Sequence, residues 1–234
     1  FTPDEEIGHG AALLDLEKFG ASYAYTVDGG APNEVEWETF YAAAADWSIA
    51  GVSVHPGDAK DKMVNAALVA MEINGMLPPD EIPAKTQGRE GFFHLCDMSG
   101  DVSAAKLSYI IRDHDAEKFS QRKQTMREIE RKINETYGVG TAALTLREQY
   151  RNMAEILQHH PDVVEQAKRA IRAVGLTPVS NPVRGGTDGA QLSFRGLPCP
   201  NLGTGAYALH GPYEHAIAEQ MDVMTEILLH IAQA

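Results

Sequence analysis

Apolar residues recur along this chain at two spacings, one typical of helices and one typical of strands. Residues 9–19 place their leucines near one helical face, and Gly20 follows as a helix stop. The next run, residues 23–27, has the aromatic and β-branched composition of a strand and ends at Asp28. We therefore expect an αβ unit whose strand carries Asp28 at its carboxyl end, where open α/β sheets collect ligands.

From about residue 38 the pattern changes to strand, helix, strand, strand, helix, strand. The predicted segments are 43–54, 60–74, 91–98, 102–112, 116–137 and 141–148. The order βαββαβ is that of a ferredoxin-like sandwich. We therefore predict an α/β protein in which a second domain, residues 39–148, is inserted between two parts of the first, residues 1–38 and 149–234.

The α/β pattern returns after residue 150. An amphipathic helix is predicted over 161–174, a turn-rich stretch over 181–189 and a last helix over about 214–232. The methionines of the last helix are typical of core filling.

Charge and cysteine content narrow the class of function. The chain has 20 basic and 33 acidic residues among 234, a formal net charge of −13. Nucleic acids and anionic membranes need a cationic surface, so we expect neither as a partner. The two cysteines, Cys96 and Cys199, form neither a zinc-type pair nor a disulfide framework. A globular protein of the reducing cytoplasm fits these features.

Side chains of the zinc-ligand type lie at the ends of predicted elements. Glu5 and Glu6 belong to an acidic run, Asp28 ends a strand, and His210 ends an apolar run that precedes the last helix. Carboxylate and imidazole are ordinary zinc ligands, and a further carboxylate can act as a base. On spacing alone, a solvated turn or helix start is the commoner role of an acidic run, so both interpretations stay open.

Five long segments resemble one known family. They are FTPDEEIG (1–8), YTVDGG (25–30), SVHPGDAKDKMVNA (53–66), SYIIRDHD (108–115) and NPVRGGTDGAQLSFRGLPCPNLGTG (181–205). They are similar to segments of the peptidase T (tripeptide aminopeptidase) family, cytosolic di-zinc exopeptidases that remove the N-terminal residue from tripeptides. The resemblance implies a zinc-peptidase α/β catalytic domain, an inserted dimerisation domain, a homodimer and a short peptide as substrate.

Carried over by position, the resemblance implies a role for each candidate metal-site residue. Glu5 is the general base, Glu6 and His210 bind one zinc, and Asp28 binds the other. The chemistry is consistent, because a water between two metal ions has a lowered pKa and a nearby carboxylate can take its proton.

The resemblance also implies residues that contact the substrate. His55 polarises the scissile carbonyl of the neighbouring subunit's site, and Arg112 binds the terminal carboxylate of the peptide. Without the resemblance, His55 is more simply a surface or capping residue, and Arg112 is a strand-end arginine paired with Asp113 or Asp115.

Three weaker candidates complete the substrate site. The resemblance places Asn65, Arg184 and Thr187 beside the peptide. The alternatives are a helix surface amide for Asn65 and a tight structural loop for the glycine-rich stretch that contains Arg184 and Thr187. That stretch lacks the Gly-Lys-Ser/Thr of a phosphate-binding loop, so no nucleotide is implied.

The sequence opens at Phe1, within what reads as a strand end, and the family's His-x-Asp motif and metal-bridging aspartate have no matching motif in it. We therefore expect the C-terminal part of such an enzyme, with some zinc ligands missing and no activity alone. A non-catalytic dimerisation fragment, or a related zinc carboxypeptidase or deacylase, stays as the alternative.

Overall fold

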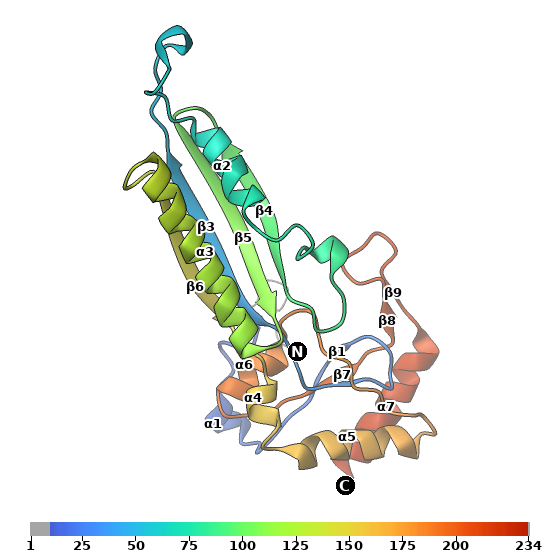
Figure 1. The fold of residues 1–234 in the computed structure, drawn as a ribbon. Coiled ribbons are helices and arrows are strands. Elements are labelled where there is room, and N and C mark those ends of the chain that lie inside the picture. The colour runs from blue at the N-terminus through green and yellow to red at the C-terminus, as the bar shows by residue number, and fades with distance from the viewer. Residues whose placement is uncertain (1–9, 234) are drawn as a thin grey trace. The chain divides into compact units, whose positions relative to one another are not determined.

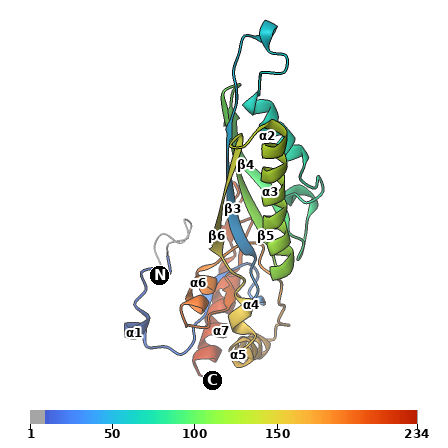
Figure 2. The ribbon, with the colours of Figure 1, turned by 60° about the vertical axis from the view of Figure 1, so that its left-hand side comes forward.

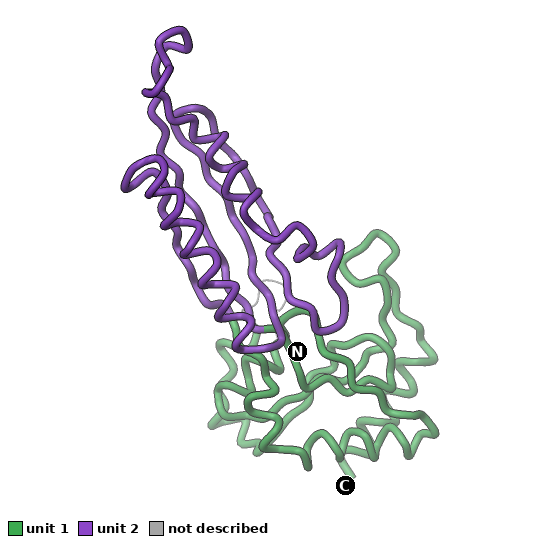
Figure 3. Tube along the Cα trace, viewed as in Figure 1, with its two compact units in different colours: residues 1–40, 150–234 green, residues 41–149 purple. Residues whose placement is uncertain are grey.

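Figure 1 shows the fold as a computed structural model that describes residues 10–233. The chain divides into two compact units (Figure 3). Residues 41–149 form one unit, which we call the insert, and residues 1–40 and 150–234 together form the other, which we call the flanking unit. The flanking unit is therefore built from two stretches of chain that the insert separates in sequence.

The insert is a ferredoxin-like sandwich, which confirms the predicted fold class. Its main elements are β3 (Tyr41–Ala50), α2 (Ala66–Gly75), β4 (Phe92–Gly100), β5 (Ala104–Asp113), α3 (Ala116–Tyr137) and β6 (Ala142–Tyr150). Two short 3-10 helices, η2 (Pro56–Asp58) and η3 (Pro83–Lys85), lie in its loops. The sheet has the strand order β4-β5-β3-β6, and Figure 2 shows both helices on one of its faces.

Alternate residues of the central strand β5 form the floor of the insert's core. They meet the apolar side of α3, whose residues are spaced by three, four and seven positions. The buried side chains are Ala105, Leu107, Tyr109 and Ile111 of β5 and Phe119, Met126, Ile129 and Ile133 of α3. Each large aliphatic or aromatic side chain buried in this way stabilises the fold by about 1.5–3 kcal/mol.

The start of α2 differs from the prediction. The helix begins at Ala66 instead of residue 60, because the Asn65 side chain accepts hydrogen bonds from the Ala67 and Leu68 amides at 3.1 and 3.3 Å. The preceding residues form turns and a β-bridge between Val52 and Val64, and β3 accordingly ends at Ala50.

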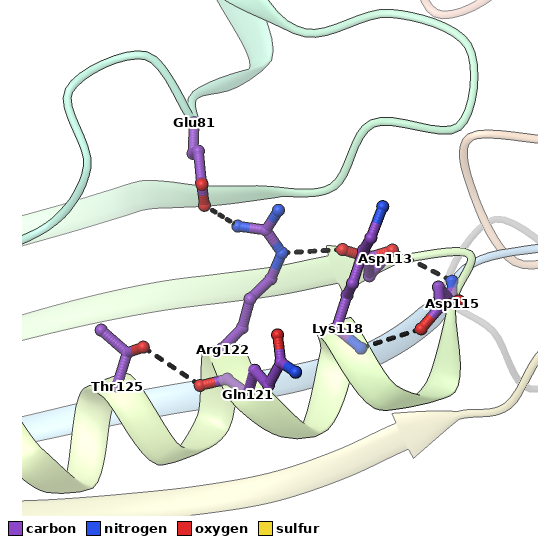
Figure 4. Close-up of polar contacts among 7 residues, drawn as sticks. All are labelled: Glu81, Asp113, Asp115, Lys118, Gln121, Arg122 and Thr125. Carbon is purple, nitrogen blue, oxygen red and sulfur yellow. Dashed lines mark hydrogen bonds and ion pairs between the residues drawn. The ribbon is translucent and has the colours of Figure 1, made fainter.

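Arg122 of α3 lies between two carboxylates and joins three parts of the insert (Figure 4). Its Nε donates to Asp113 Oδ2 at 2.9 Å, and its Nη1 pairs with Glu81 of the loop that follows α2. The guanidinium carbon also lies 5.2 Å from the centre of the Phe93 ring. Asp115 then caps α3 by accepting from the Lys118 amide at 2.9 Å.

The flanking unit has short strands and peripheral helices. Its elements are α1 (Leu16–Phe19), β1 (Thr26–Gly29), β2 (Val35–Glu36), α4 (Ala154–Leu157), α5 (Pro161–Ala173), α6 (Asp188–Phe194), β7 (Asn201–Gly203), β8 (Ala206–Tyr207), β9 (His215–Ala216) and α7 (Ala218–Ala232). Strands β1 and β7 pair in parallel, β2 joins β7 in antiparallel orientation, and β8 and β9 form a separate hairpin. Helices α5 and α7 supply most of the core around Leu202.

Several element bounds differ from the prediction. The first helix covers only α1 and the strand after it begins at Thr26. The last helix begins at Ala218, because residues 215 and 216 pair with β8 instead. Helix α6 was not predicted, and it packs closely on the strand β7 region: a Cβ at Gly189 would lie 2.5 Å from the Cys199 carbonyl oxygen.

The two stretches of the flanking unit meet where the insert begins and ends. The Thr39 amide donates to Asn152 Oδ1, and the Met153 amide donates to Thr39 Oγ1, each at 3.0 Å. Thr39 and Asn152 are both buried. These two hydrogen bonds, which we call the Thr39–Asn152 junction, join the two stretches of the flanking unit next to the points where the insert begins and ends.

Candidate functional site

Asp28 lies near the carboxyl end of β1, as the sequence predicts. The parallel register pairs Thr26 with Asn201 and Gly29 with Gly203, so β1 and β7 end at the same edge of the sheet. Thr204 holds this edge together, because its hydroxyl donates to the Gly29 carbonyl at 2.7 Å. Asp28 is exposed there, at the position where α/β sheets bind ligands.

Two further carboxylates lie near this edge. Glu36 of β2 is half-buried and accepts a hydrogen bond from Asn201 Nδ2 at 3.4 Å. Burial of the carboxyl raises the pKa of Glu36 to about 7, the carboxylates of Glu34 and Asp28 add to the rise, and the hydrogen bond from Asn201 opposes it. Carboxylate oxygens are donors of the type that divalent metals bind.

Sequence reasoning missed Glu36. The residue lies in the run EVEWE, where acidic and apolar positions alternate as they do on any strand with one solvated face. Only the pairing of β2 with β7, with Glu36 opposite Asn201, places it near the Asp28 edge.

His210 lies in the turn between β8 and β9 and not at the end of a sheet strand, which corrects the expected location. Its backbone φ is 60°, and its amide donates to Glu214 Oε2 at 2.8 Å. Glu5 and Glu6 lie outside the described residues. Within residues 10–233, no three or more His, Cys, Asp or Glu side chains gather into a group that could hold a metal ion.

Arg184 and Thr187 belong to the segment that leads into α6. The Arg184 guanidinium lies 5.2 Å from the centre of the Phe40 ring. Thr187 is buried and caps α6, because its hydroxyl accepts a hydrogen bond from the Ala190 amide at 3.0 Å. The Thr187 hydroxyl therefore has a structural role whether or not it also contacts a substrate.

His55 and Asn65 are capping residues in the insert. His55 Nδ1 accepts from the Gly57 amide at 3.1 Å, which leaves Nε2 to carry the proton of the neutral ring. Asn65 uses Oδ1 for its two amide bonds, and its Nδ2 remains as a donor. Both side chains can therefore donate a hydrogen bond to an external acceptor.

Arg112 is half-buried on β5. Its Nη1 donates to the carbonyls of Ile111 and Ala43 at 3.0 and 3.3 Å. Asp113, one of the two partners considered from sequence, pairs instead with Arg122. The backbone bonds hold the planar guanidinium in a fixed orientation, which suits bidentate binding of a carboxylate.

The structure does not bring His55 and Arg112 together within one insert. In the register of β3 with β5, Ala42 faces Arg112 and Ala50 faces Ala104, and His55 follows the Ala50 end. Eight strand positions correspond to about 27 Å. An extended tripeptide spans only about 10 Å. A single insert therefore cannot place both side chains on one short peptide.

Within residues 10–233, no helix is both long enough and apolar enough to cross a bilayer. The peptidase dimerisation domain family model matches residues 38–141. Peptidase T of Clostridium perfringens (strain ATCC 13124) is 51% identical over 231 residues, which cover 99% of this chain and 57% of that protein. Peptidase T of Halothermothrix orenii is 50% identical over 233 residues, with the same 57% covered.

Solved structures give the same fold. The crystal structure of aminopeptidase PepT from Bacillus cereus has a TM-score of 0.83 and 26% identity, and covers 98% of this chain and 62% of that one. The Bacillus subtilis YXEP protein, a dinuclear metal-binding peptidase, has a TM-score of 0.70 at 17% identity and shows a likeness of fold alone. The chain thus spans a little over half the length of the relatives it matches.

Proposed function

We propose that this chain is part of a peptidase T-like enzyme that releases the N-terminal residue of tripeptides by metal-assisted hydrolysis. The supporting observation is the 51% identity to a peptidase T over 231 residues. Since the chain covers 57% of that relative, the activity is proposed for the complete protein.

We propose zinc as the metal, with two ions in a complete subunit. Glu6 and His210 would bind one ion, and Asp28 would bind the other. When bound, such ions polarise the scissile carbonyl and lower the pKa of a water molecule. The Glu5 carboxylate would take a proton from the attacking water and pass it to the leaving amine. The exposed carboxylate of Asp28 near the carboxyl end of β1 supports this assignment.

We propose that the insert joins two copies of the chain through β4 and α2. The other edge strand, β6, carries Arg147 paired with Asp46 and Glu148 paired with Lys123, and such charges discourage strand addition. Helix α2 next to β4 exposes Leu68 and Met71, each 61% accessible. A second copy is the occupant that would cover these side chains in an isologous contact.

The separation of His55 and Arg112 supports a shared active site. If both contact one tripeptide, they must come from different subunits, because a single insert holds them about 27 Å apart. His55 of the partner subunit donates through Nε2 to the scissile carbonyl oxygen, with Asn65 at the same end of the insert. Arg112 binds the terminal carboxylate, while Arg184 and Thr187 lie beside the peptide backbone.

Subunit mixing tests the shared site in the complete protein. A His55→Ala subunit keeps Glu5 and a Glu5→Gln subunit keeps His55, so a mixed dimer has one intact site. Random mixing should restore about a quarter of the wild-type activity, whereas either variant alone is nearly inactive. If the subunits exchange and no activity returns, the shared arrangement is wrong.

Substrate choice tests the reaction class. The complete protein is assayed with tripeptides that have a free N-terminus, with dipeptides and with N-acylated amino acids. Preferred cleavage of tripeptides is expected. Preferred cleavage of the acylated compounds would assign a carboxypeptidase or deacylase instead.

We also propose a cytoplasmic location. Both cysteines are free thiols in the structure, Cys96 exposed and Cys199 buried, as suits a reducing compartment. Fractionation of cells that express the complete protein would test the location.

A further inference from the structure

A cavity of about 370 Å³ lies beside the first turns of α3 in the insert. Its walls come from α3, from β4 and from the loop that follows α2. We call it the α3 cavity, and its lining includes Pro78, Phe93, Lys118, Gln121 and Arg122. Figure 4 shows Lys118 and Arg122 projecting from the same side of α3, since they lie about one helical turn apart. Two cationic side chains therefore face one cavity.

The Lys118 ammonium is a positive charge that no neighbour in the described chain neutralises. Within residues 10–233 it makes neither an ion pair nor a hydrogen bond. Lys118 is also the third residue of α3, where the helix dipole disfavours a cation, and Arg122 repeats its charge one turn later. The wall of the cavity thus carries a cation in a place where helix stability alone does not favour one.

Arg122 adds hydrogen-bond donors whose orientation is already fixed. Its Nε and Nη1 are held by Asp113 and Glu81, and its guanidinium carbon lies 5.2 Å from the centre of the Phe93 ring. In the part of the chain that the structure describes, no contact occupies Nη2, so its two N–H groups stay available. The side chain is only 12% exposed, and little conformational freedom is left to lose when a ligand binds.

The charges around the α3 cavity favour a singly charged anion. Arg122 is already paired with the carboxylates of Asp113 and Glu81, so the charge left for a ligand is that of Lys118. A phosphate dianion would face those two carboxylates with twice the charge of a carboxylate ligand. A carboxylate also has the planar pair of oxygens that suits guanidinium donors.

An apolar cavity of about 540 Å³ adjoins the α3 cavity. Pro78 and Phe93 line both cavities, so the two are continuous. The rest of the second lining is mainly apolar and includes Leu77, Ile82, Leu95 and Tyr109. Ligand sites in proteins commonly combine such an apolar lining with a few polar groups that fix orientation. A ligand whose anionic group lies beside Lys118 can therefore place an apolar group against Phe93.

We propose that the two cavities form one binding site for an organic carboxylate with an apolar body. The carboxylate accepts hydrogen bonds from Lys118 Nζ and Arg122 Nη2, and the apolar body packs on Phe93 and Pro78. The site goes beyond the proposed reaction, which assigns no role to these residues. A free carboxylic acid and the C-terminus of a short peptide both have this chemistry.

Calorimetric titration of the complete protein tests the ligand class. Hydrocinnamate is the probe, because it joins one carboxylate to one phenyl group. Hydrocinnamamide lacks the charge and acetate lacks the phenyl group, and each should bind at least about tenfold more weakly than hydrocinnamate. Equal affinity for the amide would overturn carboxylate recognition, and equal affinity for acetate would overturn the apolar part. Absence of hydrocinnamate binding would overturn the site.

Variants of two lysines of α3 test where the probe binds. Lys118→Met should weaken hydrocinnamate binding at least about tenfold, and Lys118→Arg should stay within about threefold of the wild type. Since Lys118→Met breaks no ion pair, the far-ultraviolet circular dichroism should not change. Lys132→Met is the matched control, because Lys132 is an exposed lysine of the same helix that lines neither cavity.

Arg112 is a competing site for a carboxylate, so its variant decides between the two. Arg112→Met should bind hydrocinnamate with wild-type affinity. Loss of binding in Arg112→Met together with wild-type affinity in Lys118→Met would assign the ligand to Arg112 and overturn the proposal.

Amide hydrogen exchange locates the ligand independently of affinity. Hydrocinnamate should slow exchange in peptides covering residues 77–93 and 116–126 of the wild type, and not in Lys118→Met. Protection confined to other segments would overturn the site. The dipeptide Ala-Phe separates the two sources of the ligand: Lys118-dependent binding of the dipeptide supports a peptide C-terminus, whereas Lys118-dependent binding of hydrocinnamate alone supports a free carboxylic acid.

Discussion

Three candidate site residues cap helices, and the caps determine which of their atoms face outward. His55 uses Nδ1 for the Gly57 amide, and Asn65 uses Oδ1 for two amides of α2. Thr187 caps α6 in the same way. Because the capping bond fixes the rotamer and, for His55, the tautomer, the remaining donor is oriented before any substrate binds.

Glu5→Gln in the complete protein is expected to lower kcat at least about a thousandfold while the zinc content survives. An amide cannot accept the proton of the water, but it does not remove any of the proposed ligands. Stopped assays with a tripeptide, together with metal analysis of the same sample, measure both effects. Wild-type turnover by the variant would exclude the general-base role.

Cys199 should resist alkylation in the folded protein at pH 8. It is fully buried, and burial is the main cause that raises the pKa of its thiol to about 12, so almost no thiolate is available to react. Peptide mass analysis after brief treatment with iodoacetamide is the measurement, and the urea-unfolded chain is the control. Labelling of Cys199 at the unfolded rate would contradict its buried position.

At the scale of elements, sequence predicted best where local signals mark both ends. Helix α3 has the predicted bounds because Asp115 caps its start and Gly138 follows its end. Strand β2 and helix α6 were missed. The two residues of β2 exist as a strand only through pairing with β7, and α6 depends on close packing of Gly189 on β7, neither of which a local pattern reveals.

The candidate site was partly predictable for the same reason. Asp28 lies near the carboxyl end of β1, so its place followed from the strand-like run that precedes it in sequence. His210 lies in a turn set by the β8–β9 pairing, while Glu36 comes near the Asp28 edge only through the pairing of β2 with β7. Such contacts depend on tertiary packing, so no spacing rule could have placed them.

Arg122→Met should lower the free energy of unfolding of the insert by about 3 kcal/mol, because it leaves the buried Asp113 carboxylate without its cation. Urea unfolding followed by circular dichroism measures the change. Arg131→Met is the matched control: Arg131 and Glu135 are an exposed pair, at 59% and 60% side-chain accessibility, and its loss should cost less than about 0.5 kcal/mol. Equal effects of the two substitutions would contradict the structural role of Arg122.

At the scale of the whole molecule, the proposed site residues are distributed over two units that have separate cores. The flanking unit carries Asp28 and His210, and the insert carries His55 and Arg112. Since the insert holds its two residues at opposite ends of a sheet, the proposed enzyme requires association for chemistry and not only for stability.

Met71→Lys should therefore convert the complete protein from dimer to monomer and reduce activity in parallel. The substitution puts a charge on the exposed apolar face of α2, where a second copy is proposed to pack. Sedimentation gives the mass, and faster alkylation of Cys96 on β4 should accompany dissociation. Val139→Lys, at a fully exposed position between α3 and β6, should leave the dimer intact; loss of the dimer in that variant instead would place the contact elsewhere.

The Thr39–Asn152 junction has a consequence for the order in which the chain folds. Bringing these two residues together from an open chain closes a loop of more than a hundred residues, at an entropic cost of about 4 kcal/mol. The folded insert removes that cost, because β3 and β6 are neighbouring strands of its sheet. The Ala50 amide at the end of β3 donates a hydrogen bond to the Thr141 carbonyl just before β6, so Tyr41 and Tyr150 lie together at the opposite ends of these strands.

The insert should therefore fold first, and its folding should bring the two stretches of the flanking unit together. The two tryptophans report on this separately, since Trp47 lies in the insert's core and Trp37 in the flanking unit. The Trp37→Phe variant keeps Trp47 and so reports on the insert, whereas the Trp47→Phe variant keeps Trp37 and reports on the flanking unit. In refolding from urea, the fluorescence of the Trp37→Phe variant should change first. The reverse order would mean that residues 1–40 and 150–234 associate before the insert folds. The separation of these two stretches in sequence would then not slow the folding of the flanking unit.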